Sequence, residues 1–511
     1  MAWPMPYEEC RQPGIDIATR YLREVAAVDD DFLRDALLLV SLRVVVISIW
    51  KMEAAQTAEA AHRQGMSLDV FTEELTYIVG QIESLPAPHT AMATMEVPRP
   101  RFQRLDFLRR LKWTAKWTPL HRLLPVVLSS NFEAISLSPL LRRQLEMTGE
   151  TPVYHMSEDT LWKARKHATG ELPSGWWELV DGLIERLVNC SGLSEPYRGR
   201  LLVSLLQDAR FLVRGAGMDL LALRSVRRLP ERVWSGTGSQ YSSRCMGLEV
   251  LRRGGEVVRF CHGGTYGLMR PYGQIANLEL SVSSELVASS EAQADLIRRS
   301  GDLDYVASYR STRITATDGE PTIGDFVETL PRRPRARRAK VVYVLAVLAP
   351  YGAAPAAKIA NNILYLDFNY HVLEALRSLP IDVVAKPHPG GVFGGRRHPL
   401  SDGDVPGDTP FERVVADADV IVMDQAHSTA FWQMMSTDRG IVYIDCGITR
   451  FDPKIWPDVE RRCQVIRAYY DDANRFRIDR EELADAIATA ARRTVDPAPF
   501  RQLHMSDNAA V

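Results

Sequence analysis

The last third of the chain constrains the fold most, because short β-branched runs alternate there with helical patterns. The expected strands are Val341–Val347, Ile381–Lys386, Asp419–Met423 and Ile441–Asp445. The expected helices are Ala357–Ser378, Pro410–Ala416, Ser428–Met435 and Glu481–Arg493. This alternation predicts a doubly wound α/β domain with a parallel sheet. Ligands of such sheets bind outside the carboxyl ends of the strands, so the residues that follow each strand are the functional candidates.

In the middle of the chain, from residue 123 to about residue 308, short apolar runs alternate with helical stretches. This alternation predicts a second parallel sheet. Its strand candidates are Leu124–Ser129, Arg232–Thr237, Glu256–Gly263 and Leu286–Ser289. Its helix candidates are Gln240–Leu251 and Glu291–Arg299. The block from Met156 to Leu223 has Trp-rich and Leu-rich helical patterns, and we expect it to be an insertion that covers one edge of the sheet.

From Asp16 to about Glu83, apolar residues recur three and four positions apart. This spacing predicts helices in the first hundred residues. The longest apolar stretch, Ala36–Trp50, is interrupted by Arg43 and is shorter than the roughly 20 residues of a membrane-spanning helix, so we expect a buried helix. Pro86–Pro100 has no periodicity and is typical of a connection.

A chain of 511 residues is too long for one hydrophobic core. The Arg- and Pro-rich stretch from Ser311 to Lys340 has no apolar period, and we place a domain boundary there. The expected organisation is an α-helical N-terminal lobe (1–120), a Rossmann-like acceptor domain with a helical insertion (121–310), a linker (311–340) and a Rossmann-like nucleotide-donor-binding domain (341–511).

Composition excludes several classes of protein. The formal net charge of −2 gives no overall field that would attract DNA or RNA, so nucleic acid is not expected as a partner. The basic run Arg332–Lys340 is interpreted as a solvated linker, although it could contact anionic lipid headgroups or a charged glycan at the inner face of the membrane.

The six cysteines are scattered without CxxC spacing, which indicates neither a disulfide scaffold nor a zinc cluster and favours a reducing cytoplasm. The first residues lack the basic start and apolar run of a secretion signal. No acidic pair of the DxD type stands at a suitable strand end of the last domain, so no metal is expected.

Lys386 and His388 follow directly on an expected strand, in the sequence Lys-Pro-His-Pro-Gly-Gly. The two prolines fix the turn, and the Lys and His are presented where a phosphate could be held by charge and hydrogen bonds. A protonated His388 would help to neutralise the charge of a leaving nucleotide. The alternative is a rigid turn with a surface histidine.

Ser428 and Thr429 begin a helix after the next expected strand. Free backbone N–H groups at a helix start bind anions, and the two hydroxyls extend such a site. Ordinary N-capping by Ser or Thr is the alternative. Asp424 and Asp445 also stand at strand ends, where they could contact the ribose or base of a nucleotide, or cap a turn.

His262 ends an expected strand of the middle segment and is followed by Gly263, Gly264 and, two positions later, Tyr266. Glycines let a substrate approach the backbone closely, and a histidine there could be the general base for an acceptor hydroxyl. We expect these four residues to line the acceptor cleft, together with the segment Ser235–Gln240. A structural histidine is the alternative.

These motifs resemble those of bacterial surface-carbohydrate transferases of the GT-B fold. Similar families are the CDP-glycerol glycerophosphotransferases of teichoic-acid synthesis and the CMP-sugar transferases (sialyl and Kdo) with a His-Pro motif. The resemblance spans about Val233 to Ala491; it implies donor-phosphate contacts by His388-Pro389 and by Ser428-Thr429, and a base at His262-Gly263. We find no counterpart of the acidic motif that supplies the base in sialyltransferases.

The resemblance implies an α/β, GT-B-like protein with two Rossmann-like domains facing a cleft, to which this chain adds the N-terminal helical lobe. The expected function is an inverting, metal-independent glycosyltransferase of surface-polysaccharide or glycoconjugate synthesis. It would use no cofactor, a nucleotide sugar as donor and a glycan or lipid-linked acceptor. CMP-linked acidic sugars rank before CDP-glycerol and UDP-sugars as donors. The alternatives are a glycerophosphotransferase, a non-catalytic scaffold of the same fold and a sugar epimerase.

Overall fold

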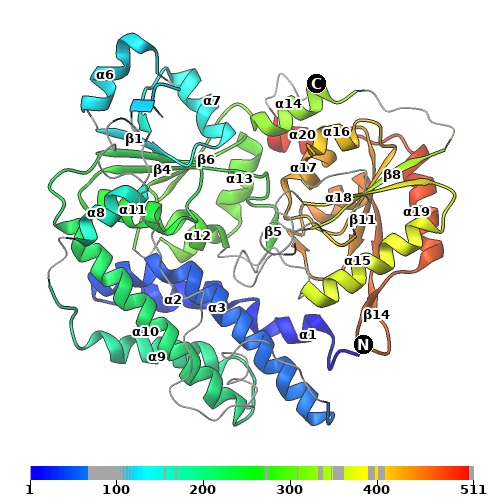
Figure 1. The fold of residues 1–511 in the computed structure, drawn as a ribbon, viewed down its shortest axis with the longest axis horizontal. Coiled ribbons are helices and arrows are strands. Elements are labelled where there is room, and N and C mark those ends of the chain that lie inside the picture. Colours follow the sequence, from blue (N-terminus) through cyan, green and yellow to red (C-terminus); the bar gives the residue numbers. More distant parts are fainter. Residues whose placement is uncertain are drawn as a thin grey trace.

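The computed structural model contains two parallel β-sheets side by side, each flanked by helices (Figure 1). It describes residues 2–66, 108, 111–112, 114–116, 118–129, 131–154, 157–166, 170–270, 274–307, 309–331, 338–346, 348, 362–388, 398–400 and 409–505. The connection expected at residues 86–100, residues 332–337 of the basic run and Pro389 lie outside the described residues.

The first sheet has six parallel strands in the order β2-β1-β3-β4-β6-β7. They are β1 (Phe132–Ile135), β2 (Val153–Tyr154), β3 (Arg232–Ser235), β4 (Glu256–Phe260), β6 (Glu285–Ala288) and β7 (Arg313–Ala316). The chain runs from β1 out to β2, then returns across β1 to β3 on the other side. The carboxyl ends of β1 and β3 are therefore the topological switch point of this sheet.

Helices and short helical turns surround the first sheet. They are α6 (Leu120–Ser129), α7 (Pro139–Thr148), α11 (Tyr241–Arg252), α12 (Gln274–Leu278), η4 (Leu280–Val282), α13 (Glu291–Arg299) and η5 (Asp302–Tyr305). The expected strand Leu124–Ser129 was wrong, because these residues belong to α6 and the strand follows at β1. Ser138 and Ser290 begin α7 and α13 by accepting hydrogen bonds from backbone N–H groups three residues on.

The second sheet has five parallel strands in the order β13-β11-β10-β8-β9. They are β8 (Lys340–Val344), β9 (Asp382–Lys386), β10 (Val420–Met423), β11 (Gly440–Asp445) and β13 (Gln464–Arg467). The helices around it are α15 (Asn362–Arg377), α16 (Phe411–Val415), α17 (Thr429–Met435), α18 (Trp456–Arg462) and α19 (Arg480–Arg492). The switch point again lies between the first and third strands of the sheet, β8 and β10, so both sheets share one strand order. The expected doubly wound parallel arrangement is confirmed for this segment.

The stretch from residue 311 to residue 340 differs from the expected linker. It contains β7, the edge strand of the first sheet, and α14 (Pro321–Thr329), which packs against α7 and α17. The short strand Arg313–Ala316 has only one fully buried side chain, Ile314, because an edge strand is covered on fewer sides. An apolar period is therefore hard to see in its sequence.

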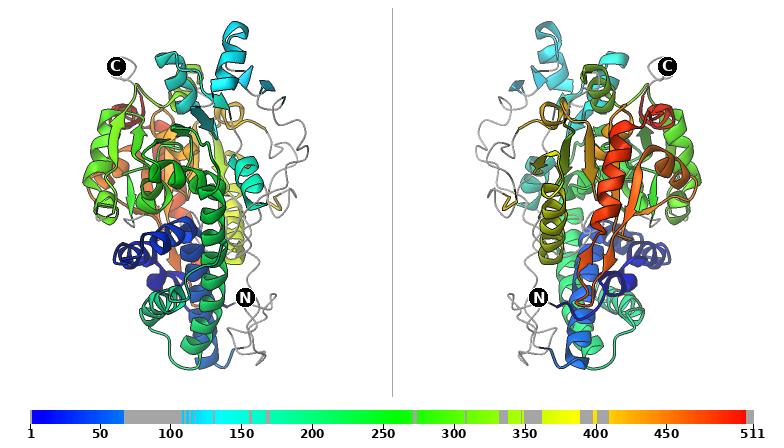
Figure 2. Two further views of the ribbon diagram at one scale, coloured as in Figure 1. Left: turned by 90° about the vertical axis from the view of Figure 1, so that its left-hand side faces the viewer. Right: turned by 90° about the vertical axis from the view of Figure 1, so that its right-hand side faces the viewer.

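The N-terminal residues form α1 (Tyr7–Arg11), η1 (Gln12–Gly14), α2 (Ile17–Ala26) and the long α3 (Asp31–Arg63). The expected buried helix at Ala36–Trp50 lies inside α3. The block expected as a helical insertion forms α8 (Ser157–Arg165), α9 (Trp176–Asn189) and α10 (Tyr197–Arg224). Its α10 packs mainly on α3 and on α9, with smaller contacts to α8 and α11, instead of covering a sheet edge. Figure 2 shows these long helices below the two sheets from both sides.

Two short elements connect the two sheets. β5 (Met269–Arg270), which follows the first sheet's β4, pairs antiparallel with β12 (Arg450–Phe451), which follows the second sheet's β11. The last helix, α20 (Ala498–His504), packs against α13, and Ser290 Oγ donates to the backbone oxygen of Leu503 at 2.8 Å. The hairpin of β14 (Tyr469–Tyr470) and β15 (Phe476–Arg477) lies after β13.

Among the helices of the described residues, none combines the length and the hydropathy that a membrane span needs. The described end of the basic run is paired, since Arg338 lies 3.2 Å from the Asp382 carboxylate and Lys340 lies 3.6 Å from that of Asp417. All six cysteines are free thiols.

Candidate functional site

His262 stands in a glycine-rich turn that follows β4. Gly263 and Gly264 have φ angles of 75° and 73°, in the left-handed region that glycine adopts without strain. The imidazole is exposed, and its Nδ1 lies 3.3 Å from the hydroxyl oxygen of Tyr266. Tyr266 is buried and donates to Glu279 Oε1 at 2.6 Å. His262, Tyr266 and Glu279 therefore form a chain of three polar side chains, which we call the relay.

The relay determines which nitrogen of His262 carries the proton. The Tyr266 hydroxyl has a single proton, which it donates to Glu279, so toward His262 its oxygen can only accept. Nδ1 of a neutral ring is then protonated, and the lone pair is on Nε2. Nε2 is thus free to accept a proton from a substrate hydroxyl, as a general base does.

Glu279 is anchored from behind and has no exposed surface. Its Oε2 accepts from the backbone N–H of Gly238 at 2.7 Å, in the loop after β3. Two fully buried guanidinium groups, those of Arg244 and Arg259, lie near it. Burial lowers the pKa of each arginine to about 10, while the carboxylate of Glu279 acts in the opposite direction. The negative charge of the relay is therefore balanced inside the protein.

The sequence predicted the loop after β3 but not Glu279. The expected segment Ser235–Gln240 contributes Gly238, whose backbone holds the carboxylate. Glu279 itself lies just beyond α12, with no strand directly before it. Nothing in the local sequence marks it, because its role depends on contacts with residues 13 and 41 positions away.

The turn after β4 contacts α17, a helix that flanks the second sheet. A Cβ atom on Gly263 would lie 3.0 Å from Thr429 Oγ1, and one on Gly264 would lie 3.2 Å from Trp432 Cβ. Thr429 and Trp432 both belong to α17, which follows β10. Two motifs predicted separately, His262-Gly263 and Ser428-Thr429, are thus in contact.

The start of α17 has the predicted capping geometry. Ser428 is its N-cap, and Ser428 Oγ accepts from the backbone N–H of Ala430 at 3.2 Å. A hydroxyl that accepts in this way still has its own proton to donate to a ligand. His427, which directly precedes it, was not predicted; burial lowers the pKa of its imidazole to about 4, and the charge of Arg11 acts in the same direction.

Lys386 is the last residue of β9, at the carboxyl edge of the second sheet, and His388 lies two residues beyond it. β9 is the edge strand, and β8 lies between it and β10, so β9 and β10 are about 10 Å apart by strand spacing. Lys386 is buried and its Nζ donates to the backbone oxygen of Pro387 at 2.6 Å. His388 is exposed, and its pKa is lowered by partial desolvation and then by the charge of Lys386. This direction favours a neutral imidazole.

Asp424 lies directly after β10, at the switch point, and is buried. Its Oδ2 accepts from the hydroxyl of Tyr343 at 2.6 Å, and its Oδ1 accepts from that of Tyr365 at 2.7 Å. Asn369 donates to the same Oδ2 at 3.2 Å. Burial raises the pKa of Asp424 to about 6. The carboxylate therefore joins β8, β10 and α15 beneath the candidate site.

Asp445 ends β11 and closes a turn. Its Oδ1 accepts from the backbone N–H of Gly447 at 2.9 Å, an arrangement typical of turn-capping aspartates. Burial raises the pKa of its carboxyl, and the bond from Gly447 opposes that shift. Within the described residues, no group of three or more His, Cys, Asp or Glu side chains could hold a metal ion.

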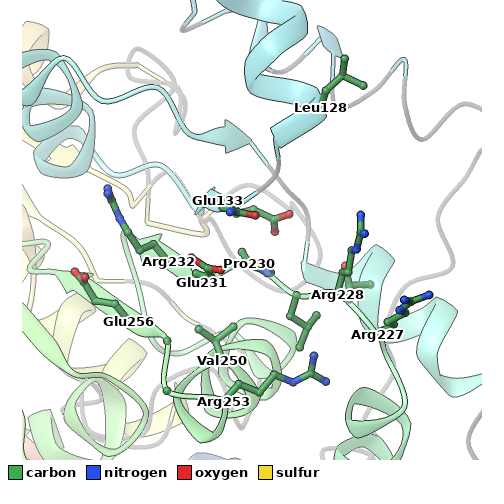
Figure 3. Close-up of a pocket in the computed structure, with 15 residues that line it drawn as sticks. Leu128, Glu133, Arg227, Arg228, Pro230, Glu231, Arg232, Val250, Arg253 and Glu256 are labelled. Atoms are coloured by element: carbon green, nitrogen blue, oxygen red, sulfur yellow. The ribbon is translucent and has the colours of Figure 1, made fainter.

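A separate pocket of about 870 Å³ lies at the amino ends of β1, β3 and β4, on the opposite edge of the first sheet from His262. Figure 3 shows arginine and glutamate side chains together around it, including Arg228, Arg232, Glu133 and Glu231. The mixture of both charges gives this pocket no clear preference for an anion or a cation.

No protein-family model and no curated protein matches the chain. Among solved structures, the crystal structure of an α,α-trehalose 6-phosphate synthase from Burkholderia multivorans is similar, with 9% sequence identity and a TM-score of 0.29 over 69% of this chain and 76% of that chain. This similarity is too low to assign a family or an activity. The structure defines a class of architecture, an α/β protein with parallel sheets.

Proposed function

We propose that the chain is a glycosyltransferase with a GT-B-like arrangement, which transfers a sugar from a nucleotide donor to a glycan acceptor. One observation carries the proposal: the His262 turn after β4 contacts Thr429, at the start of α17 after β10. A candidate base and a candidate phosphate site, on two different sheets, thereby adjoin each other. Group transfer requires this adjacency of acceptor activation and leaving-group binding.

In the proposed reaction, Nε2 of His262 takes the proton of an acceptor hydroxyl. The acceptor oxygen forms a bond to the anomeric carbon of the donor, and the bond from that carbon to the phosphate oxygen breaks. The phosphate leaves with the electron pair, and a direct displacement of this kind inverts the configuration. The hydroxyls of Ser428 and Thr429 donate to the leaving phosphate, as does the imidazole of His388. Lys386 adds positive charge behind that turn.

Tyr266 and Asp424 act indirectly in this proposal. Tyr266 fixes the tautomer and the orientation of His262, and Asp424 fixes the ends of β8 and β10. Asp445 and the loop that it caps would adjoin the nucleoside. Among donors we rank CMP-linked acidic sugars first, then CDP-glycerol and UDP-sugars, on the sequence resemblance alone.

The first experiment is a calorimetric titration of the protein with CMP, CDP and UDP. Binding of one nucleotide identifies the donor class and permits a search for transfer activity with that donor. If none of the three binds, the donor-site assignment is wrong, and a non-catalytic scaffold becomes the better interpretation. His388→Ala should abolish turnover without changing the unfolding curve.

The second experiment tests the relay with Tyr266→Phe. We expect kcat to fall on the order of tenfold to hundredfold with little change in KM, because the imidazole loses its orientation but the substrate contacts remain. Tyr309→Phe is the matched control, since the buried hydroxyl of Tyr309 has no hydrogen-bond partner among the described residues. A kcat of Tyr266→Phe equal to that of the control would remove His262 as the oriented base.

A further inference from the structure

The pocket at the amino ends of β1, β3 and β4 has the size of a small-molecule site. Its volume of about 870 Å³ lies within the range of roughly 300–1,000 Å³ that such sites occupy. Its lining comes from residues 227–232, which lead into β3, from residues 253–256, which lead into β4, and from Asn131 and Glu133 at the start of β1. None of these described lining residues belongs to the candidate functional site.

Two adjacent arginines, Arg227 and Arg228, form one side of the pocket, which we call the arginine wall. Both side chains are exposed, and neither makes a hydrogen bond or an ion pair with another described residue. The segment before them is held against the end of α11, because Arg253 Nη2 donates to Leu223 O at 3.0 Å and to Val226 O at 2.8 Å. The two guanidinium groups therefore share one anchored loop, where they can donate together to a single anionic group.

Two glutamates, Glu231 and Glu256, form the other side, which we call the glutamate wall. Glu231 is exposed and Glu256 is partly buried, and neither carboxylate makes a hydrogen bond or an ion pair within the described part of the chain. The backbone N–H of Glu231 donates to Asn131 O at 2.9 Å, and that of Glu256 donates to Glu231 O at 2.8 Å. These bonds place the two glutamates next to each other at the amino edge of the sheet.

The other two arginines of the lining are already paired. Arg232 Nη2 lies 2.9 Å from Glu150 Oε1, and Arg253 Nε lies 2.7 Å from Glu249 Oε1. Figure 3 shows the guanidinium groups of the arginine wall on one side of the pocket and the carboxylates of the glutamate wall on the other. The charges that remain for a ligand are thus separated, with two positive groups on one wall and two negative groups on the opposite one.

This separation determines the class of ligand. A simple anion at the arginine wall would be repelled by the carboxylates, and a simple cation at the glutamate wall would be repelled by the guanidinium groups. A zwitterion meets opposite charge at both ends. Because the two walls carry equal and opposite formal charge, a molecule with one carboxylate and one ammonium group fits better than a phosphate dianion.

We infer that this pocket binds an amino-acid-like or peptide-like zwitterion. Its carboxylate is held by Arg227 and Arg228, since a guanidinium binds a carboxylate through two parallel N–H donors. Its ammonium group is held by Glu231 and Glu256. The inference does not depend on the proposed function, because the pocket and the candidate functional site lie at opposite edges of the first sheet.

The first test is a calorimetric titration of the full-length protein with glycine, diglycine, triglycine and tetraglycine, which are zwitterions of increasing charge separation. We expect binding that is tightest at one length, the one that spans the two walls. The N-acetylated and the C-amidated forms of that peptide should each bind on the order of tenfold more weakly, because each has lost one charge. Equal binding of the three forms, or binding by none of the four peptides, would overturn the inference.

The second test uses variants with unchanged unfolding curves. Arg228→Gln and Glu231→Gln should each weaken binding of the zwitterion on the order of tenfold. The matched control is Arg492→Gln, at an exposed arginine that ends α19, which should bind as the wild type does.

A third measurement separates charge recognition from a structural role. With Glu231→Gln and Glu256→Gln combined, the N-acetylated peptide, a pure anion, should bind more tightly than it does to the wild type, because the repelling carboxylates are gone. Weaker binding of that anion to the double variant would overturn the inference. Each of these outcomes leaves the proposed function standing, since no residue of the candidate functional site is changed.

Discussion

His504, the last residue of α20, makes the stability of the fold depend on pH. Its side chain is fully buried, between the turn after β4 and α17. A Cβ atom on Gly264 would lie 3.2 Å from His504 Cε1, and the ring centroids of His504 and Trp432 are 5.8 Å apart. Neither ring nitrogen has a hydrogen-bond partner within the described residues. Burial lowers the pKa of this histidine from 6.5 to about 3.

The sign of the effect follows from proton linkage. Below pH 6.5 His504 takes up a proton in the unfolded chain but not in the folded protein, so the free energy of unfolding falls as the pH decreases toward 3. Each pH unit in this window costs about 1.4 kcal/mol. The expected loss is about 2 kcal/mol by pH 5, and on the order of 4–5 kcal/mol by pH 3.

Other groups also titrate in this range, so the test compares variants. His427, with a pKa of about 4, acts in the same direction as His504. Asp424, whose pKa is raised to about 6, acts in the opposite direction, because its protonation on acidification favours the folded state. Both contributions are present in the wild type and in His504→Phe, and they cancel in the difference between the two proteins.

The assay is urea unfolding at pH 7.5 and at pH 5 for the wild type, His504→Phe and His121→Phe. His121 is exposed and serves as the control for the substitution itself. His504→Phe should lose about 2 kcal/mol less than the other two proteins between the two pH values. The comparison remains valid if the phenylalanine changes stability at pH 7.5, since each protein is its own reference. Equal losses in all three proteins would refute the reasoning.

Two further substitutions test the packing. Gly263→Ala should destabilise more than Gly254→Ala in urea unfolding, because both glycines have positive φ (75° and 84°) but only the first would place a Cβ against Thr429 Oγ1. We expect about 1–2 kcal/mol for the backbone conformation alone, and equal losses would exclude the interdomain contact. Lys51→Met should cost about 3–5 kcal/mol, since it leaves the carboxylate of Asp208 buried without its 2.5 Å ion pair. Adding Asp208→Leu should recover part of that loss, and a further loss would contradict the charge argument.

The sequence predicted elements best where both faces of a strand are buried. β10 and β11 are continuous apolar runs because helices cover the sheet on both sides, and their expected positions agree with the structure within a residue or two. β1 was missed because its four residues include Glu133, a buried charged residue that breaks the apolar run. The apolar run before it forms α6, where Leu120, Leu124 and Leu128 are spaced as on one helix face and are exposed.

The candidate site was predictable only as far as local turn chemistry extends. A histidine before two glycines and a Ser-Thr pair after a strand are visible in the sequence, and they contact each other in the structure. Glu279 was not visible. Its position depends on tertiary contacts with Gly238 and Tyr266, 41 and 13 positions away. Sequence periodicity contains no information about such pairs.

The two sheets have the same strand order, but they contribute to the candidate site from different strands. In the second sheet, Ser428 follows β10, directly at the switch point where a doubly wound sheet is open to ligands. In the first sheet, the loops after β1 and β3 close that opening, since a Cβ on Gly236 would lie 2.2 Å from Ser136 O. His262 follows the next strand, β4, which is the nearest carboxyl end left free of this contact. A Gly236→Ala variant should therefore disturb the fold of the first sheet rather than a ligand site.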